Sequence, residues 1–232
     1  MNSITRLASL IMPLGLIAAA LPVRADDVPN NNFRIGSYSV FFHTKADDLQ
    51  GPYVPAGTNI KANNIETLYL AYVRRLNTNF EVELALGIPP KTETKGKGPA
   101  TLGSVPYDGQ VISTARWLAP TLLVNYKFLD DSYKLRPYIG FGVNYTSFYD
   151  RRSTPAGDAA SGGPTRLSLT SSVGPAGTVG LSYNLGHGFG AYLSYSVSQV
   201  KTHLAADTAG VIRSTHISFG PQALIAAVGY SF

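Results

Sequence analysis

The sequence predicts an all-β protein: an eight-stranded antiparallel transmembrane β-barrel with short periplasmic turns and long extracellular loops. Three observations lead to this prediction. The chain begins with an export signal, segments with a two-residue period recur along the rest of it, and the connections between these segments alternate between short and long. Membrane barrels show this pattern of alternating segments and unequal connections.

The first 25 residues are typical of a secretory signal peptide. Arg6 gives a positive start, residues 7–21 are mostly apolar, and Val23 and Ala25 precede a cleavage site before Asp26. The apolar run is shorter than the roughly 20 residues that a spanning helix needs. We therefore expect a signal peptide over 1–25, an outer-membrane location and one barrel domain over 26–232.

Composition excludes several function classes. Of the 19 Lys and Arg, Arg6 and Arg24 lie in the predicted signal, so 17 remain against 14 Asp and Glu. This slight excess does not indicate nucleic acid binding. The chain has no cysteine, which excludes a zinc–cysteine cluster, a thiol nucleophile and a disulfide scaffold. The histidines at 43, 187 and 203 lie in different connections, so we expect no metal site and no cofactor.

Eight segments alternate between apolar and small or polar side chains, as half-buried strands do. The clearest is "RPYIGFGVNYTSFY", in which Ile139, Phe141 and Val143 alternate with small or polar residues. The predicted strands are 33–44, 65–76, 80–88, 115–128, 136–149, 173–184, 190–202 and 215–232. Short turns at 77–79, 129–135 and 184–188 alternate with long polar segments at 45–64, 89–114, 150–172 and 203–214.

Charged residues decide which face of a strand points inward. In a soluble sandwich the apolar face would form the core, but in a membrane barrel it meets lipid. Glu81 and Glu83 share one face of strand 80–88, and a charge against lipid is costly, so that face is assigned to the lumen. The same rule places Ile139, Phe141 and Val143 outward. The faces of strand 33–44 are less clear, because both are apolar.

These faces predict the residues that line a channel: Tyr69, Trp117, Thr121, Leu123, Gly140, Gly142, Asn144 and Ile225. Near the short turns we expect an ionic plug built from Arg75, Glu81, Glu83 and Lys127, with Arg34 and Arg136 as further candidates. A salt-bridged core filling a narrow barrel is the alternative interpretation. Two interpretations of the glycines in these strands remain open: they leave empty space in the lumen, or they allow the strands to curve.

Two features near strand ends suggest further roles. Pro120 lacks a backbone donor, and we expect it to weaken the wall beside strand 80–88 as a lateral gate, although a simple bulge is an equal alternative. Tyr230 and the terminal Phe232 share one face of the last strand and resemble the signal read by the barrel assembly machinery. Loop cations are expected to contact lipopolysaccharide: Lys91, Lys95, Lys97, Arg151 and Arg152.

Three stretches resemble the OmpW family of outer-membrane proteins, which includes the alkane-uptake porins: "PTLLVNYKF", "LRPYIGFGVNYT" and "VGPAGTVGLSYNL". The resemblance covers the chain after the predicted signal. It implies an eight-stranded barrel with a narrow, largely apolar channel for small hydrophobic molecules, blocked toward the periplasm and with sideways exit through the wall.

Two other functions remain open at this stage. His216 and Ser218 have the spacing of a base and nucleophile in outer-membrane lipid A deacylases. Those enzymes are also eight-stranded barrels. The orienting acid is missing, because no Asp or Glu follows Asp207. We therefore expect no enzyme. A structural or adhesive barrel that acts through its loops is the stronger alternative.

Overall fold

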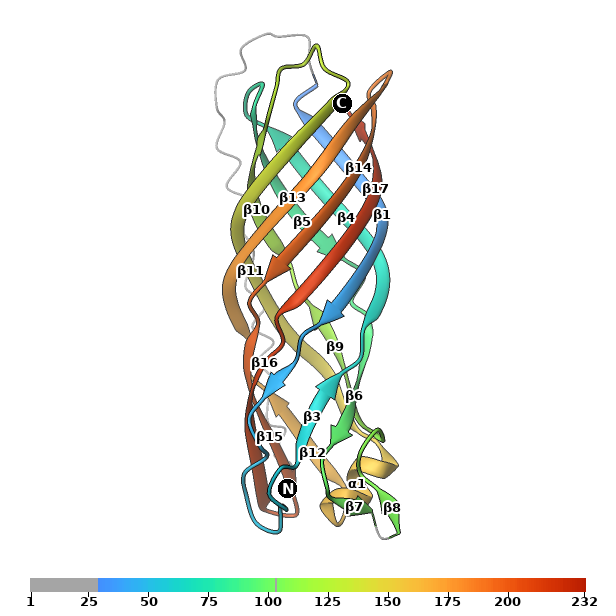
Figure 1. Cartoon of the computed structure of the whole chain (residues 1–232), viewed down its shortest axis with the longest axis vertical. Helices are drawn as coiled ribbons and strands as arrows, with labels where there is room; N and C mark the ends of the chain where they lie inside the picture. The colour runs from blue at the N-terminus through green and yellow to red at the C-terminus, as the bar shows by residue number, and fades with distance from the viewer. Residues whose placement is uncertain (1–28, 103) are drawn as a thin grey trace, which may run out of the picture.

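The computed structural model describes residues 29–102 and 104–232. The predicted signal peptide and its cleavage site lie outside the described residues. Within these two ranges, no helix is both long and apolar enough to cross a membrane. The described chain is dominated by long, tilted antiparallel strands that enclose a central axis (Figure 1).

Eight strands close the barrel, which confirms the predicted fold class. In order around the wall they are β1 (Asn31–Phe42), β4 (Ile65–Arg75), β5 (Phe80–Gly87), β10 (Thr121–Lys127), β11 (Leu135–Ser153), β13 (Ser172–Gly186), β14 (Phe189–Ser198) and β17 (Pro221–Ser231). The first and last strands meet, because β1 pairs with both β4 and β17. β10 pairs with both β5 and β11, which completes the ring.

Side-chain exposure confirms the predicted faces of the clearest strand. Phe141 and Val143 are 67% and 52% exposed, whereas Asn144 and Thr146 are 4% and 0% exposed. Because successive side chains of a strand point to opposite faces, the first pair faces lipid and the second faces the interior. In β1, whose faces were unclear, Phe41 points outward and Phe42 inward.

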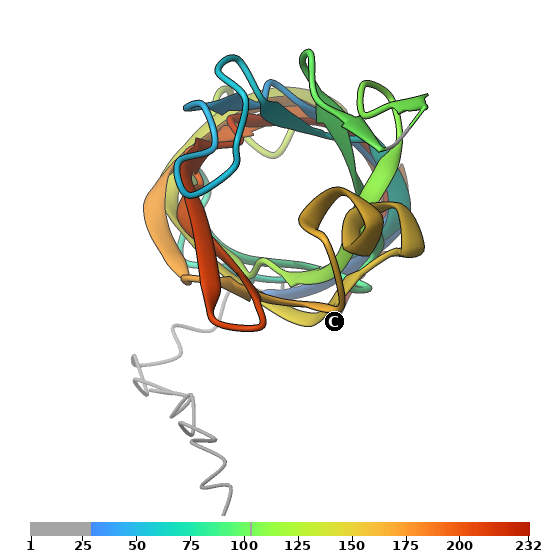
Figure 2. The ribbon, with the colours of Figure 1, turned by 90° about the horizontal axis from the view of Figure 1, so that it is seen from below.

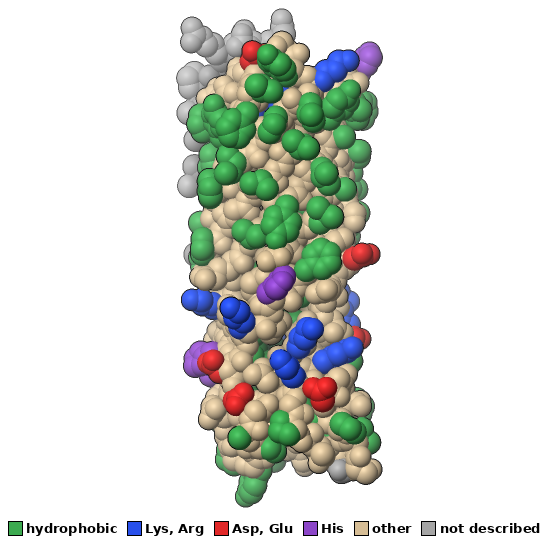
Figure 3. Space-filling model, in the orientation of Figure 1, with side chains coloured by type: hydrophobic (Ala, Val, Ile, Leu, Met, Phe, Trp, Pro, Cys, Tyr) green, Lys and Arg blue, Asp and Glu red, His purple; other side chains and the backbone are tan. Residues whose placement is uncertain are grey.

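The outward side chains form a hydrophobic belt around the barrel, with Lys and Arg side chains gathered beyond its edge (Figure 3). At the short-turn end the belt carries exposed aromatic residues: Tyr72, Phe80, Tyr126, Phe128, Tyr183 and Tyr230. Tyr138 lies near the same end but faces the interior, where it is 4% exposed. It shares the inner face of β11 with Gly140, as strand parity requires.

The long segments predicted as loops continue largely as strands beyond the barrel wall (Figure 1). Seen along the axis, these outer segments surround the open end of the ring (Figure 2). β9 (Val111–Leu118), β6 (Lys91–Lys97) and β3 (Asn59–Ala62) extend the sheet from β11. A second sheet has the order β12 (Thr165–Leu169), β15 (Lys201–Thr208), β16 (Val211–Ser218) and β2 (Lys45–Ala46). The remaining elements are a hairpin of β7 (Thr101–Leu102) and β8 (Val105–Pro106) and a short helix, α1 (Pro155–Ser161).

Sequence patterns missed β6 because both of its faces are polar. In β6, "KTETKGK", Thr92 is buried and Lys91 is exposed, so the strand alternates in burial without alternating in hydrophobicity. Three predicted strands also break, at residues 119–120, 199–200 and 219–220. Gly220 has a φ of 45°, a left-handed conformation that glycine adopts most easily.

Candidate functional site

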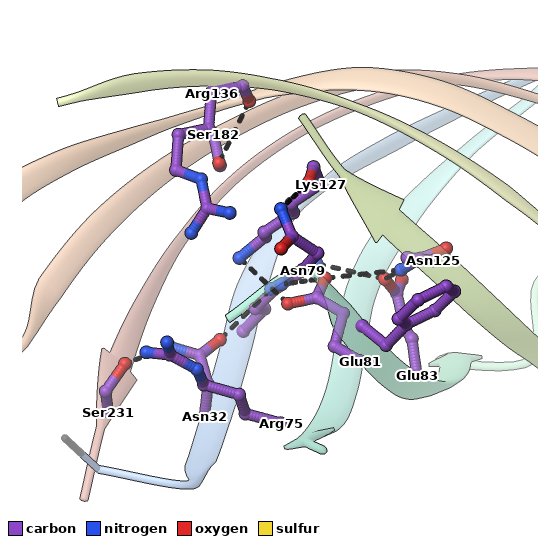
Figure 4. A network of polar contacts seen from close by, with 12 residues as sticks. Asn32, Arg75, Asn79, Glu81, Glu83, Asn125, Lys127, Arg136, Ser182 and Ser231 are labelled. Carbon is purple, nitrogen blue, oxygen red and sulfur yellow. Dashed lines mark hydrogen bonds and ion pairs between the residues drawn. The ribbon is translucent and has the colours of Figure 1, made fainter. Parts of the chain in front are cut away.

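Charged and polar side chains cross the interior near the short turns, and we call this group the charged cluster. Its members are Arg34, Glu81, Glu83, Asn125 and Lys127. Figure 4 labels the last four of them. Arg34 Nη2 lies 2.8 Å from Glu81 Oε1, and Arg34 Nη1 lies 2.9 Å from Glu83 Oε2. Lys127 Nζ lies 2.8 Å from Glu81 Oε2, and Asn125 Nδ2 donates to Glu83 Oε2 at 2.7 Å. Two cations thus face two carboxylates.

Neighbouring side chains hold Arg34 and Glu83 in place. Arg34 Nε donates to Asn32 Oδ1 at 3.0 Å, and the guanidinium carbon lies 3.9 Å from the centre of the Tyr192 ring. The hydroxyl of Tyr69 donates to Glu83. Arg34 is 1% exposed, and a buried ion pair is stable only when its remaining hydrogen-bonding groups are satisfied. The cluster therefore fills this level of the lumen.

Arg75 is a correction to the predicted plug, because it does not join the charged cluster. Its guanidinium pairs instead with Asp131 in the turn between β10 and β11. Arg136 uses the same carboxylate, with Nη1 2.7 Å from Asp131 Oδ1. Since these groups lie at the rim, they tie the turns together. Arg34, which was only a further candidate, occupies the central position.

A polar hollow of about 430 Å³ lies between the charged cluster and the short-turn end. Asn32, Arg75, Lys134 and Arg136 line it together with Arg34 and Lys127 of the cluster. On the other side of the cluster the interior contains smaller and less polar cavities. The charged cluster therefore separates two regions of different chemistry.

The residues predicted to line a channel all point to the interior. Tyr69, Thr121, Leu123 and Ile225 border a cavity of about 40 Å³. Trp117 and Asn144 border a second cavity of about 60 Å³, nearer the extracellular end. Gly140 and Gly142 face inward from β11 but border neither cavity.

The inward glycines allow close packing and do not create empty space. A Cβ on Gly140 would collide with Asn125 Oδ1 of the charged cluster, and one on Gly142 would collide with the carbonyl oxygen of Leu122. A Cβ on Gly180 would lie 2.5 Å from the ring of Tyr138. Gly177 faces outward beside Phe141. The glycine positions thus let neighbouring strands and side chains approach.

Four rings meet inside the barrel at the extracellular edge of the belt, and we call them the aromatic cluster: Phe42, Trp117, Phe148 and Phe219. The Trp117 ring centre lies 4.8 Å from Phe42, 4.8 Å from Phe148 and 4.6 Å from Phe219. The pairs are tilted or edge-to-face, which is the favoured aromatic geometry. Only Trp117 was predicted; Phe42 ends β1, and Phe219 lies in the break between β16 and β17.

Beyond the aromatic cluster, an apolar hollow of about 90 Å³ lies between the two outer sheets. Leu49, Ile60, Ile112, Leu167 and Leu204 contribute to its lining. The interior therefore presents apolar surface on both sides of the aromatic cluster.

The wall has a break between β5 and the β9–β10 strand. Regular pairing ends at Ala85 and Thr121 and resumes at Lys91 and Arg116. Five residues on one side, 86–90, thus face four on the other, 117–120. Pro89 lacks a donor, and its carbonyl accepts a bond from the Arg116 side chain at 3.0 Å. Both lumen cavities reach this break, through Leu86 and Ala119 in one and Gly87 and Ala119 in the other.

A family model described as the OmpW family matches residues 31–232. The chain belongs to the OmpW family. Outer membrane protein W of Vibrio cholerae is 29% identical over 224 residues, which cover 96% of this chain and 98% of that protein. The "Dibenzothiophene metabolism operon protein PahQ" of Pseudomonas aeruginosa is 34% identical over 155 residues, covering 64% and 65%.

Solved structures agree with this OmpW-family fold. OprG from Pseudomonas aeruginosa matches with a TM-score of 0.79 and 22% identity, over 88% of this chain and 96% of that one. AlkL matches with a TM-score of 0.64 and 20% identity, over 91% and 95%. Membership places this protein in the outer membrane.

Membership also bears on the hydrolase alternative, because relatives such as that of Vibrio cholerae are named as outer-membrane proteins. The structure places His216 and Ser218 on the outward face of β16, where the His216 ring lies 4.8 Å from that of His203. The two side chains therefore do not belong to the lumen of this OmpW-family barrel.

Proposed function

We propose that this OmpW-family barrel takes up small hydrophobic molecules passively and releases them sideways into the outer membrane. The observation that carries the proposal is the division of the interior. Three mostly apolar cavities lie between the extracellular end and the charged cluster, and there paired charges fill the lumen. An eight-stranded barrel holds at most one small ligand, which suits such cargo and not a wide aqueous pore.

The name of one relative supports this class of cargo. PahQ is named for an operon of dibenzothiophene metabolism, and dibenzothiophene is an apolar aromatic compound. An aromatic solute would find a matching surface in the aromatic cluster, where ring edges and faces are both presented. Trp117 would be the central contact, because it touches the other three rings of the cluster.

The charged cluster favours a sideways exit over a straight one. A desolvated apolar molecule gains nothing by crossing buried ion pairs, and separating those pairs is costly. The wall break beside β5 offers another route, because both lumen cavities reach it. Outward of the break lie Leu86, Ile88 and Leu118 of the hydrophobic belt.

The break does not depend on Pro120 in the way that the sequence suggested. The Pro120 carbonyl accepts a hydrogen bond from Tyr145 N of β11 at 2.9 Å. In an antiparallel pair, the N–H and C=O of one residue point to the same neighbouring strand. The missing donor of Pro120 is therefore on the β11 side, whereas Pro89 faces β9 across the break.

Uptake of a hydrophobic probe tests the proposal. Cells that produce the protein should accumulate a fluorescent polycyclic aromatic hydrocarbon severalfold faster than cells that lack it, because the outer leaflet slows apolar solutes. Uptake of a small sugar of similar mass should be equal in both. Equal hydrocarbon uptake in both strains would refute the channel and leave the structural or adhesive function as the better proposal.

We also propose that Tyr230 and Phe232 are read by the barrel assembly machinery. Their rings face the same way, with centres 6.5 Å apart, and Phe232 exchanges backbone hydrogen bonds with Asn31 where the barrel closes. Deleting Phe232 should lower the folded outer-membrane fraction, measured by the mobility of unheated protein on gels. Phe232→Tyr is the control and should assemble normally. Normal assembly of the deletion would contradict this role.

A further inference from the structure

A basic hollow lies on the outward face of β15 and β16. In register, His203 pairs with His216, and Ser218 lies between Lys201 and Lys45 on the two neighbouring strands. The adjacent residues Thr202 and Ile217 are 4% and 3% exposed and point into the barrel. By strand parity, the histidines and lysines therefore point away from the barrel axis.

This hollow lies just beyond the extracellular edge of the hydrophobic belt. On β14 the outermost apolar residue of the belt is Val197, which is 43% exposed, and Lys201 follows four residues later. Lys and Arg side chains gather at this level of the barrel (Figure 3). In an outer-membrane protein, this is the depth at which the phosphorylated sugars of the outer leaflet begin.

The side chains that line the hollow fit an anion. Its volume is about 450 Å³, and the residues that line it include Lys45, Lys201, His203, His216 and Ser218. The His203 and His216 ring centres are 4.8 Å apart, so one group can contact both. Asp47 is the one carboxylate among these lining residues of the described chain.

We propose that this hollow binds a phosphate group of lipopolysaccharide in the outer leaflet. Ammonium and imidazole N–H groups form charge-assisted hydrogen bonds with phosphate oxygens. The lipid chains would then lie along the belt residues of β14 and β17, including Val197 and Leu224. Two imidazoles alone would also suit a divalent metal ion, but the two ammonium groups beside them repel a cation.

Binding of phosphorylated lipid A to the purified full-length protein in nanodiscs tests this proposal. Lys45→Gln with Lys201→Gln should weaken retention of lipid A about tenfold, as expected for losing charge-assisted bonds. His203→Gln with His216→Gln should weaken it to a similar degree. Lipid A without its phosphates should bind the wild type as weakly as these variants bind the phosphorylated form.

The matched control is Lys61→Gln with Arg166→Gln, which removes two exposed cations from β3 and β12 that do not line the hollow. This control should retain lipid A like the wild type. Equal loss in the control would show a general charge effect and overturn the site. Tight binding of inorganic phosphate without lipid would overturn the lipid assignment. Stoichiometric Zn²⁺ binding that His203→Gln abolishes, with lipid A retention unchanged, would show a metal site instead.

Discussion

Replacing Arg34 with methionine should destabilise the folded barrel by roughly 3–5 kcal/mol, the usual cost of removing one partner from a buried ion pair. Glu81 would keep Lys127, but Glu83 would keep only the neutral Asn125 and Tyr69 as partners. Both carboxylates are 4% exposed, so the Glu83 charge would stay largely buried without its cationic partner. Urea titration of the purified protein, followed by the gel mobility of unheated samples, measures the change.

A second substitution separates charge from packing. Adding Glu83→Gln to Arg34→Met removes the unpaired carboxylate while keeping its shape, so it should recover a large part of the lost stability. Arg34→Lys should be intermediate, because an ammonium lacks the fork that reaches Glu81 and Glu83 together. If Arg34→Met unfolds at the wild-type urea concentration, the charged cluster does not hold the barrel together.

Cross-linking across the wall break should reduce hydrocarbon uptake to the level of cells without the protein. The chain has no cysteine, so Gly87→Cys and Ala119→Cys introduce the only two thiols. Both positions border the cavity of about 60 Å³, and a Cβ on Gly87 meets no atom closer than 3.4 Å. A short, reducible thiol cross-linker should block uptake by joining the two sides, and reduction should restore it.

The control joins the same strands where the ladder is intact. Ala85 and Thr121 are paired in register, so a cross-link between Ala85→Cys and Thr121→Cys adds little constraint and should leave uptake unchanged. Pro120→Val should also leave uptake unchanged, because the donor it restores faces β11. The Gly87–Ala119 cross-linked protein could take up hydrocarbon as fast as the wild type, while cells that lack the protein still take it up more slowly. That result would show that cargo leaves elsewhere.

The sequence by itself determined the features that depend on local period and on the cost of exposing charge. Alternation predicts the eight strands, and strand parity places Phe141 outward and Asn144 inward, as the structure confirms. Glu81 and Glu83 orient β5 because lipid cannot solvate them. Each of these inferences needs only one strand and its surroundings.

The tertiary structure decided what depends on the pairing of strands far apart in the sequence. Arg34 meets Glu81 and Glu83 only because β1 and β5 both pair with β4, which brings their inner faces close together, and Arg75 is drawn away to Asp131 at the turn. The strand register decides which neighbouring strand faces the missing N–H of a proline. For Pro120 that neighbour is β11. The polar strand β6 forms because β3 and β9 supply partners for its backbone, and no local hydrophobic period records that support.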